Sequence, residues 1–227
     1  MRARRLLKLE DDGAELVAGA LQASEVESIL LALHGHDAGR PGLRLSELKG
    51  LHDWLGPEGM IGRIAAKWLG PRGVPVRAIL FDKNATSNWA LGWHQDRTIA
   101  VSKRDDVSGF NNWNRKDGVD HVEPPFDLIE RMLTVRIHLD AASHDNAPLL
   151  ICPGTHRLGK IAESSLPEIA RSHGSHECIA ATGDVWVYRT AIVHASKRSA
   201  SPSRRRVLQV DYSADELPAP LSWKLQA

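Results

Sequence analysis

The triplet His94-Gln95-Asp96 places an imidazole and a carboxylate two residues apart. Residues i and i+2 of a β-strand project to the same side, so both side chains could reach one metal ion. A later histidine, His194, could complete a set of two histidines and one carboxylate. Such a set leaves neighbouring coordination positions open, which suits non-haem Fe(II) and oxygen chemistry, although zinc can be held by the same residue types.

A second pair with the same spacing, His138 and Asp140, competes for this assignment. With 11 histidines in 227 residues, chance alone supplies roughly one His-x-Asp pair, so the spacing cannot decide. The chain between Asp96 and His194 has room for the several strands that must return to one ion, which favours the first pair. His138 and Asp140 lie on a long regular strand, where we expect them to form hydrogen bonds on its polar face.

His194 follows an apolar run, and a lone histidine in that setting is more often a hydrogen-bonded core residue than a ligand. Arg205, eleven residues further on, changes this balance. A 2-oxoglutarate molecule that chelates iron leaves its second carboxylate some way from the metal, and the planar fork of an arginine binds a carboxylate bidentately. By strand alternation, Arg204 and Arg206 should point away from Arg205.

The first third of the sequence is expected to be helical. Ser24 to Glu27 fits a capping box at the start of one helix, and Gly35 is a plausible stop. Two more helices are predicted over residues 46–55 and 57–70.

From Val74 onward the pattern changes to short strands. Leu133 to Asp140 alternates apolar and polar residues, and residues 102–127 form a polar stretch that is either a lid or a disordered surface loop. Many short strands in succession indicate a β-sandwich or barrel. The strands are expected at residues 76–81, 89–93, 98–101, 133–140, 149–152, 177–180, 185–188, 192–196 and 207–212.

Bulk composition limits the classes of function. Hydrophobic residues make up 42% and charged residues 25%, with a formal net charge of +1, which argues against a polyanion-binding surface over the whole protein. No apolar stretch approaches the roughly 20 residues that cross a bilayer. Charged residues interrupt the apolar run after the N-terminus, so we expect no secretory signal. Cys152 and Cys178 are expected to be buried thiols, and the location to be cytoplasmic.

Several motifs together resemble the phytanoyl-CoA dioxygenase family, and they match it in order and approximate spacing. The opening residues 12–17, with a helix after them, are similar to that family's entry strand and first helix, so the resemblance spans nearly the whole chain. The one departure is at Asn146-Ala147-Pro148, where the family more often has glycine, and it affects turn geometry more than chemistry. The motifs are Trp93-His94-Gln95-Asp96, Asn146-Ala147-Pro148-Leu149, Pro153-Gly154-Thr155-His156, Gly183-Asp184, His194-Ala195-Ser196 and Arg205-Arg206.

The resemblance implies a mainly β fold with N-terminal helices around a double-stranded β-helix core of the jelly-roll, cupin-like kind. One oxygenase domain would cover residues 1–227, with an entry strand and helical layer in 1–73, the β-helix core in 74–213 and a C-terminal tail in 214–227. The same resemblance assigns Fe(II) to the two histidines and the aspartate described above. It assigns the distal carboxylate of 2-oxoglutarate to Arg205 with help from Ser196, and a further cosubstrate contact to Trp113.

The expected activity is hydroxylation of an unactivated C–H bond in a small molecule, with O2 as co-reactant and release of succinate and carbon dioxide. The alternative is a non-catalytic or zinc-binding cupin-like barrel that holds a small ligand. Arg205 and Ser196 favour the oxygenase, because a zinc site has no need of a carboxylate clamp at that spacing. A nucleic-acid demethylase is a weaker third hypothesis, because the charge balance predicts no basic groove, and a role for Arg136 in an anionic-substrate pocket stays open. The sequence names no substrate and no oligomeric state.

Overall fold

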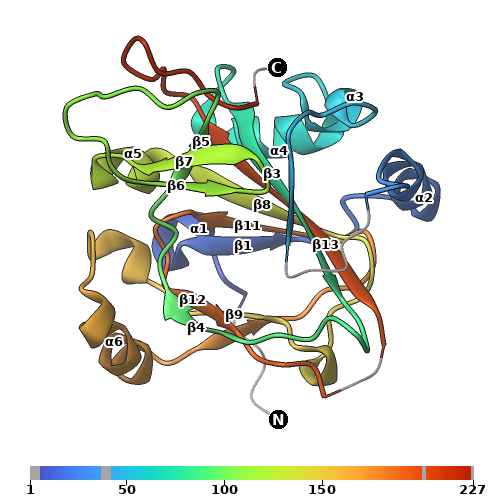
Figure 1. Cartoon of the computed structure of the whole chain (residues 1–227). Coiled ribbons are helices and arrows are strands. Elements are labelled where there is room, and N and C mark those ends of the chain that lie inside the picture. The colour runs from blue at the N-terminus through green and yellow to red at the C-terminus, as the bar shows by residue number, and fades with distance from the viewer. Residues whose placement is uncertain (1–5, 37–41, 201–202, 226–227) are drawn as a thin grey trace.

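The fold is built around three antiparallel sheets, and a layer of helices covers one face of the largest sheet (Figure 1). The structure is a computed structural model that describes residues 6–36, 42–200 and 203–225. The helices are α1 (Leu9–Asp12), α2 (Ala23–Ala32), α3 (His52–Leu55), α4 (Met60–Leu69), α5 (Phe126–Arg131) and α6 (Leu166–His173). The strands are β1 (Ala14–Val17), β2 (Leu43–Leu45), β3 (Val74–Lys83), β4 (Leu91–His94), β5 (Ile99–Val101), β6 (Asn111–Lys116), β7 (Val119–Glu123), β8 (Leu133–His138), β9 (Leu149–Ile151), β10 (His176–Cys178), β11 (Val185–Arg189), β12 (His194–Ser196) and β13 (Arg205–Ser213).

The largest sheet has six strands in the order β1-β11-β8-β13-β3-β2, and a four-stranded sheet has the order β10-β9-β12-β4. In Figure 1 the strands β4, β9 and β12 lie together below the larger sheet. Strands distant in the sequence are neighbours in both sheets, as in a jelly roll. The predicted double-stranded β-helix core is therefore confirmed.

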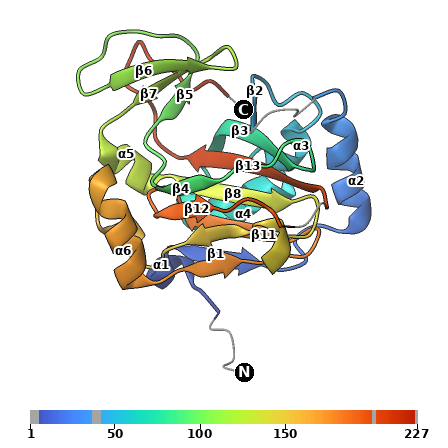
Figure 2. The ribbon, with the colours of Figure 1, turned by 60° about the horizontal axis from the view of Figure 1, so that its bottom comes forward.

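The outer face of the six-stranded sheet is apolar and packs against α2, α3 and α4 (Figure 2). On β8, Leu133, Val135 and Ile137 belong to this core and are fully buried, as the alternation of that segment predicts. Leu208 and Val210 of β13 lie beside them. Each Å² of apolar surface removed from water contributes about 25 cal/mol to stability. This apolar interface is therefore the main source of stability for the helical layer.

The inner face of the same sheet is polar and faces the four-stranded sheet. Alternation puts Arg77 and Lys83 of β3, Arg136 of β8, and Arg205 and Gln209 of β13 on this side. All five are buried. A buried charge is costly unless it is paired, so this face predicts a ligand-binding cavity rather than an ordinary core.

Residues 102–127 include regular secondary structure instead of the polar loop expected from the sequence. They contain the hairpin of β6 and β7, which joins β5 in a three-stranded sheet and leads into α5. Val122 and Phe110 are buried against Ile99 and Ile129. The prediction of a polar loop was wrong because the polar residues of β6 lie on a half-exposed strand whose partner strand supplies the apolar contacts.

Two details of the helical region also differ from expectation. Helix α2 begins at Ala23, and its capping box is formed by Gln22 and Glu25 rather than by Ser24 and Glu27. Of the helix predicted over residues 46–55, only α3 forms, because the preceding residues make turns that follow the edge strand β2. The third predicted helix corresponds to α4.

The C-terminal segment packs on the structure. Leu221 and Trp223 are buried in the cluster beneath the three-stranded sheet, and Trp223 forms a β-bridge with Val101. Among the residues that the structure describes, no helix has the length and apolar character needed to span a membrane.

Tyr212 ties the sheet to the helical layer, because its buried hydroxyl donates a 2.8 Å hydrogen bond to the backbone oxygen of Leu55. Tyr212→Phe should lower the free energy of unfolding by about 1–3 kcal/mol, since it leaves that carbonyl buried without its partner. Urea denaturation at equilibrium measures the change.

Ser28→Ala is the matched control, since the Ser28 hydroxyl donates to the oxygen of Ser24 on an exposed helix surface. Its effect should stay below about 0.5 kcal/mol. Equal losses for the two variants would contradict the assignment of Tyr212 as a buried link.

Candidate active site

His94, Asp96 and His194 come together at one end of the four-stranded sheet. His94 ends β4, His194 begins β12, and the two residues lie directly opposite each other in the ladder. Each of the three offers one ligand atom within 4.8 Å of the others. Among the described residues, this is the one group of three or more potential ligands close enough to hold a metal ion.

The two imidazoles are held in the same way. Nδ1 of His94 lies 2.8 Å from the oxygen of Gly92, and Nδ1 of His194 lies 2.9 Å from the oxygen of Ile192. A carbonyl can only accept, so each Nδ1 carries the proton and each Nε2 keeps a free lone pair. Burial and the neighbouring His94 lower the pKa of His194 to about 3, which keeps this imidazole neutral.

Gln95 explains why its neighbours face the same side. Its side chain points away from the pair, donating to the oxygens of Gly159 and Ala191 and accepting from the backbone N–H of Ile161. These three bonds fix the end of β4 to the segment between β9 and α6 and to the residues just before β12. The middle residue of the motif is thus a structural anchor.

Arg77 holds the carboxylate of Asp96. Its Nη2 lies 3.3 Å from Oδ2 of Asp96, its Nε donates to Asp211, and its Nη1 donates to the oxygen of Thr98 at 3.1 Å. Burial acts to raise the pKa of Asp96, but Arg77 and the two imidazoles overcome this and lower it to about 2. Asp96 is therefore ionised at neutral pH, as a metal ligand must be.

These residues fit a divalent metal ion. His94 and His194 each present the Nε2 lone pair, and Asp96 adds a charged carboxylate whose Oδ2 forms the ion pair with Arg77. Two nitrogen ligands and one carboxylate with open positions are typical of non-haem iron sites. The fit therefore rests on the geometry and on the protonation of the donors.

The competing pair lies elsewhere. Asp140 accepts hydrogen bonds from Nε and the backbone N–H of Arg206, both at 2.8 Å. His138 is 1% exposed, and neither of its ring nitrogens has a hydrogen-bond partner among the described residues. The prediction of a hydrogen-bonding role is right for Asp140 and wrong for His138, because His138 faces the charged interior beside Arg136 and Arg205.

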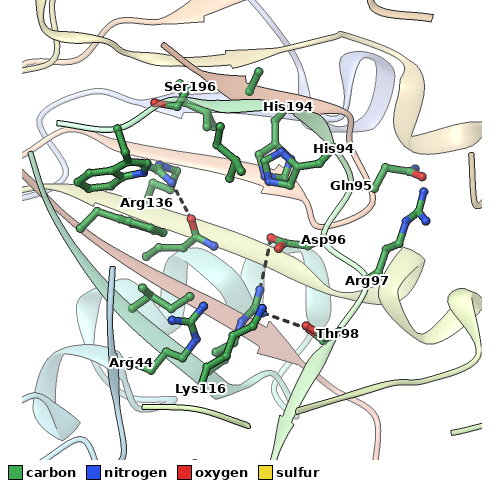
Figure 3. A pocket seen from close by; sticks show the side chains of 18 of the residues that line it. Arg44, His94, Gln95, Asp96, Arg97, Thr98, Lys116, Arg136, His194 and Ser196 are labelled. Atoms are coloured by element: carbon green, nitrogen blue, oxygen red, sulfur yellow. Dashed lines mark hydrogen bonds and ion pairs between the residues drawn. The ribbon is translucent and has the colours of Figure 1, made fainter. Parts of the chain in front are cut away.

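One cavity of about 470 Å³ joins the metal-ligand group to the polar face of the large sheet (Figure 3). Arg205, the first residue of β13, lines it, and its Nε and Nη1 are buried without hydrogen-bond partners in the described chain. Arg204 and Arg206 turn outward to Asp82 and Asp140, as alternation predicts. Burial and Arg136 lower the pKa of Arg205 to about 9.

Ser196 lies in the same cavity, two residues after His194. Its hydroxyl accepts a 2.9 Å hydrogen bond from Nζ of Lys83, which also donates to the backbone oxygens of Trp89 and Lys197. Burial, Arg205 and Arg136 lower the pKa of Lys83 to about 7.

Arg136 donates to Gln209 at 2.6 Å, and its Nε is unpartnered in the described chain. Among the described residues, Arg136 is thus a buried cation with a neutral partner and Arg205 a buried cation with two unpartnered nitrogens, an arrangement that fits a dicarboxylate such as 2-oxoglutarate.

Trp113 does not line this cavity. It lies on β6, packs against the cluster beneath the three-stranded sheet, and has the Arg104 guanidinium 5.5 Å from its ring centre. Trp89 is the tryptophan that lines the cavity, close to Phe81 and Lys83. The place of Trp113 in the site was inferred from its distance along the chain from His94. That distance takes no account of the irregular register of the hairpin between Asn111 and Asn114.

The sequence placed Trp89, in residues 84–89, among those that could line the pocket, and it does line the cavity. Arg77 and Lys83 were not singled out, although both lie with Ile79 and Phe81 on one side of β3. Only the fold shows that this side of β3 faces Asp96 and Ser196.

Comparisons with known proteins show which family and which fold this chain is similar to. A family model described as phytanoyl-CoA dioxygenase matches residues 9–207. An L-proline trans-4-hydroxylase of Streptomyces griseoviridis is 25% identical over 219 residues, covering 83% of this chain and 69% of the relative. Among solved structures, AviO1 of Streptomyces viridochromogenes Tue57 is similar with a TM-score of 0.62 and 21% identity, covering 93% of this chain and 95% of that one. HygX of Streptomyces hygroscopicus, with nickel and 2-oxoglutarate bound, has a TM-score of 0.61 and 15% identity, covering 90% and 83%.

His94→Ala should lower the affinity for Fe(II) by at least about 100-fold, because it removes one of three protein ligands. His138→Ala should retain the wild-type affinity, since His138 is outside the group of three. Anaerobic desalting after loading with Fe(II), followed by measurement of iron per chain, compares the two variants. Loss of iron from the His138 variant and retention by the His94 variant would reverse the assignment.

Proposed function

The chain belongs to the phytanoyl-CoA dioxygenase family, and we propose that His94, Asp96 and His194 hold the iron of this Fe(II)- and 2-oxoglutarate-dependent oxygenase. Arg205 and Ser196 are proposed to bind the cosubstrate. The observation that carries this proposal is the combination, in one cavity, of three convergent ligand atoms and a buried arginine with free donors.

When bound, iron and 2-oxoglutarate together supply the oxidising power to put one oxygen atom of O2 into a C–H bond and release succinate and carbon dioxide. The chain's own residues prepare the site for this reaction. The oxygens of Gly92 and Ile192 keep the lone pairs of the two imidazoles directed at the metal position. Arg77 fixes the Asp96 carboxylate and balances its charge. Orientation of this kind typically changes metal affinity by 10–100-fold.

Cosubstrate binding depends on buried charge. Arg205 has two buried donor nitrogens, Nε and Nη1, without hydrogen-bond partners in the described chain, and its guanidinium can form charge-assisted hydrogen bonds with a carboxylate. Lys83 holds the Ser196 hydroxyl at the wall of the same cavity, and Arg136 adds positive charge near Arg205. Because these groups are nearly excluded from water, their attraction for a dicarboxylate is stronger than at a surface.

Asp96 also bears on the type of reaction. A carboxylate at this position occupies a coordination place that a halide would otherwise need, so hydroxylation is proposed rather than halogenation. The zinc-barrel alternative has no use for the free donors of Arg205, and the family assignment favours the oxygenase.

The substrate is proposed to be a small molecule, since the cavity of about 470 Å³ must hold both cosubstrate and substrate. The related L-proline trans-4-hydroxylase supports an amino-acid-sized substrate. A cytoplasmic location is proposed from the two buried cysteines, Cys152 and Cys178, because a reducing compartment keeps thiols reduced. We propose no nucleic-acid or membrane partner, in line with the net charge of +1.

Arg205→Met should raise the concentration of 2-oxoglutarate needed for half-maximal succinate formation by about 100-fold, because it removes two charge-assisted hydrogen bonds. Succinate released in air by the Fe(II)-loaded protein, without added substrate, gives the slow uncoupled rate. Arg171→Met on exposed helix α6 is the control and should behave as the wild type. No succinate from the wild type, or equal half-saturation in the Arg205 variant, would contradict the proposal.

A further inference from the structure

The cavity has a second cationic end, separate from the residues assigned to the cosubstrate. Arg44 and Lys116 line it there, and Figure 3 shows them on the side of Asp96 opposite to Ser196 and Arg136. The metal-ligand group therefore lies between two positively charged regions.

Arg44 is directed into the cavity by its place on the edge strand β2. Its neighbours Leu43 and Leu45 pack into the apolar core beneath the helices, so alternation turns Arg44 to the inner face, opposite Ile79. Its Nη1 donates to Asp117 at 3.2 Å, while its Nε is buried and has no partner in the described chain.

Lys116 is the last residue of β6, next to the turn at Asp117 and Gly118. The Arg44–Asp117 ion pair fixes this turn against β2 and so sets the position of Lys116. Among the described residues, none forms a side-chain hydrogen bond or ion pair with Lys116, whose side chain is exposed at the edge of the cavity. Desolvation, Arg44 and Arg77 lower the pKa of Lys116 and outweigh the opposite effect of Asp96, so the positive charge around Lys116 exceeds the negative charge.

The other polar groups at this end do not cancel that charge. Arg77 is committed to Asp96 and Asp211. His121 is neutral, because burial and Arg77 lower its pKa to about 4, and its Nδ1 donates to the oxygen of Val119. The Nε2 of His121 is a buried acceptor with no partner among the described residues, available to an N–H or O–H group of a ligand.

We propose that Lys116 and Arg44 bind the carboxylate of a small carboxylic acid, the substrate, and thereby direct one of its C–H bonds toward the metal site. Asp117 offsets part of the charge of Arg44, which leaves roughly one uncompensated positive charge and suits a monoanion better than a phosphate. The inference rests on the proposed function and adds the substrate class to it.

The test uses the anaerobic Fe(II)- and 2-oxoglutarate-loaded protein and a panel of probes. The probes are the proteinogenic amino acids and short aliphatic carboxylic acids, each paired with its primary amide. Binding is read from the shift of the weak visible band of the iron–cosubstrate complex, and succinate formation in air follows for each probe that binds. We expect at least one acid to shift the band, with its amide needing at least tenfold higher concentration.

Lys116→Met should raise the half-saturating concentration of that acid by about tenfold or more and remove the preference over the amide. Lys116→Arg should restore the preference. Half-saturation by 2-oxoglutarate should change less than twofold in both. Lys103→Met is the matched control, since Lys103 lies outside the cavity beside Asp105.

Amides that bind as well as their acids, or no acid that shifts the band, would overturn the inference. So would a Lys116→Met variant whose affinity for 2-oxoglutarate falls as much as its affinity for the acid. In each case the band itself still forms with 2-oxoglutarate, so the proposed function stands. Failure of the band to form at all would instead remove the proposed function.

Discussion

Arg77 lies buried between two carboxylates, Asp96 and Asp211, and this interaction joins the metal-ligand segment to the six-stranded sheet. Thr134 on the neighbouring strand donates to Asp211 at 3.0 Å, so the network crosses β3, β8 and β13. An ion pair buried in this way contributes little net stability, but removal of one partner leaves an uncompensated charge and is strongly destabilising. The main effect of this interaction is on position. Through Arg77, the six-stranded sheet fixes the Asp96 carboxylate, which lies in the loop after β4.

The inner face of the six-stranded sheet, on which Arg77 lies, holds more positive than negative charge. Arg136 and Arg205 have only neutral hydrogen-bond partners, or none, among the described residues. Lys83 is similarly held by backbone oxygens and a hydroxyl. Binding of anions is the simplest compensation for such charge, and a reaction that brings together a dicarboxylate and an anionic substrate makes use of it. On this interpretation, the polar interior of the barrel lowers the stability of the protein without ligands, and bound anions supply the missing partners of its buried cations.

The sequence predicted most of the strands and the two faces of β8, because alternation is a local signal that burial of one face preserves. Its choice of His94 over His138 agrees with the geometry, since only the ladder between β4 and β12 brings a distal histidine to the pair. Arg205 was chosen because it begins a strand eleven residues after His194, and the structure places it on the wall of the same cavity.

What could not be predicted depends on contacts between distant segments. The roles of Arg77, Lys83 and Arg44 follow from which strands are neighbours, and the hairpin of β6 and β7 gains its burial from residues outside it. Trp113 was judged from its distance along the chain, whereas the irregular register of the hairpin sends it to another cluster. Local patterns thus predicted the three residues proposed as ligands, whereas the residues around them follow only from the assembled sheets.

Anaerobic titration of the Fe(II)-loaded protein with 2-oxoglutarate, followed by visible absorption, tests most directly whether the three residues and the cationic cavity form one oxygenase site. We predict a weak charge-transfer band that appears only when both iron and 2-oxoglutarate are present and that is absent from the His94→Ala protein. A wild-type protein without the band, or a His94→Ala protein that shows it unchanged, would contradict this assignment.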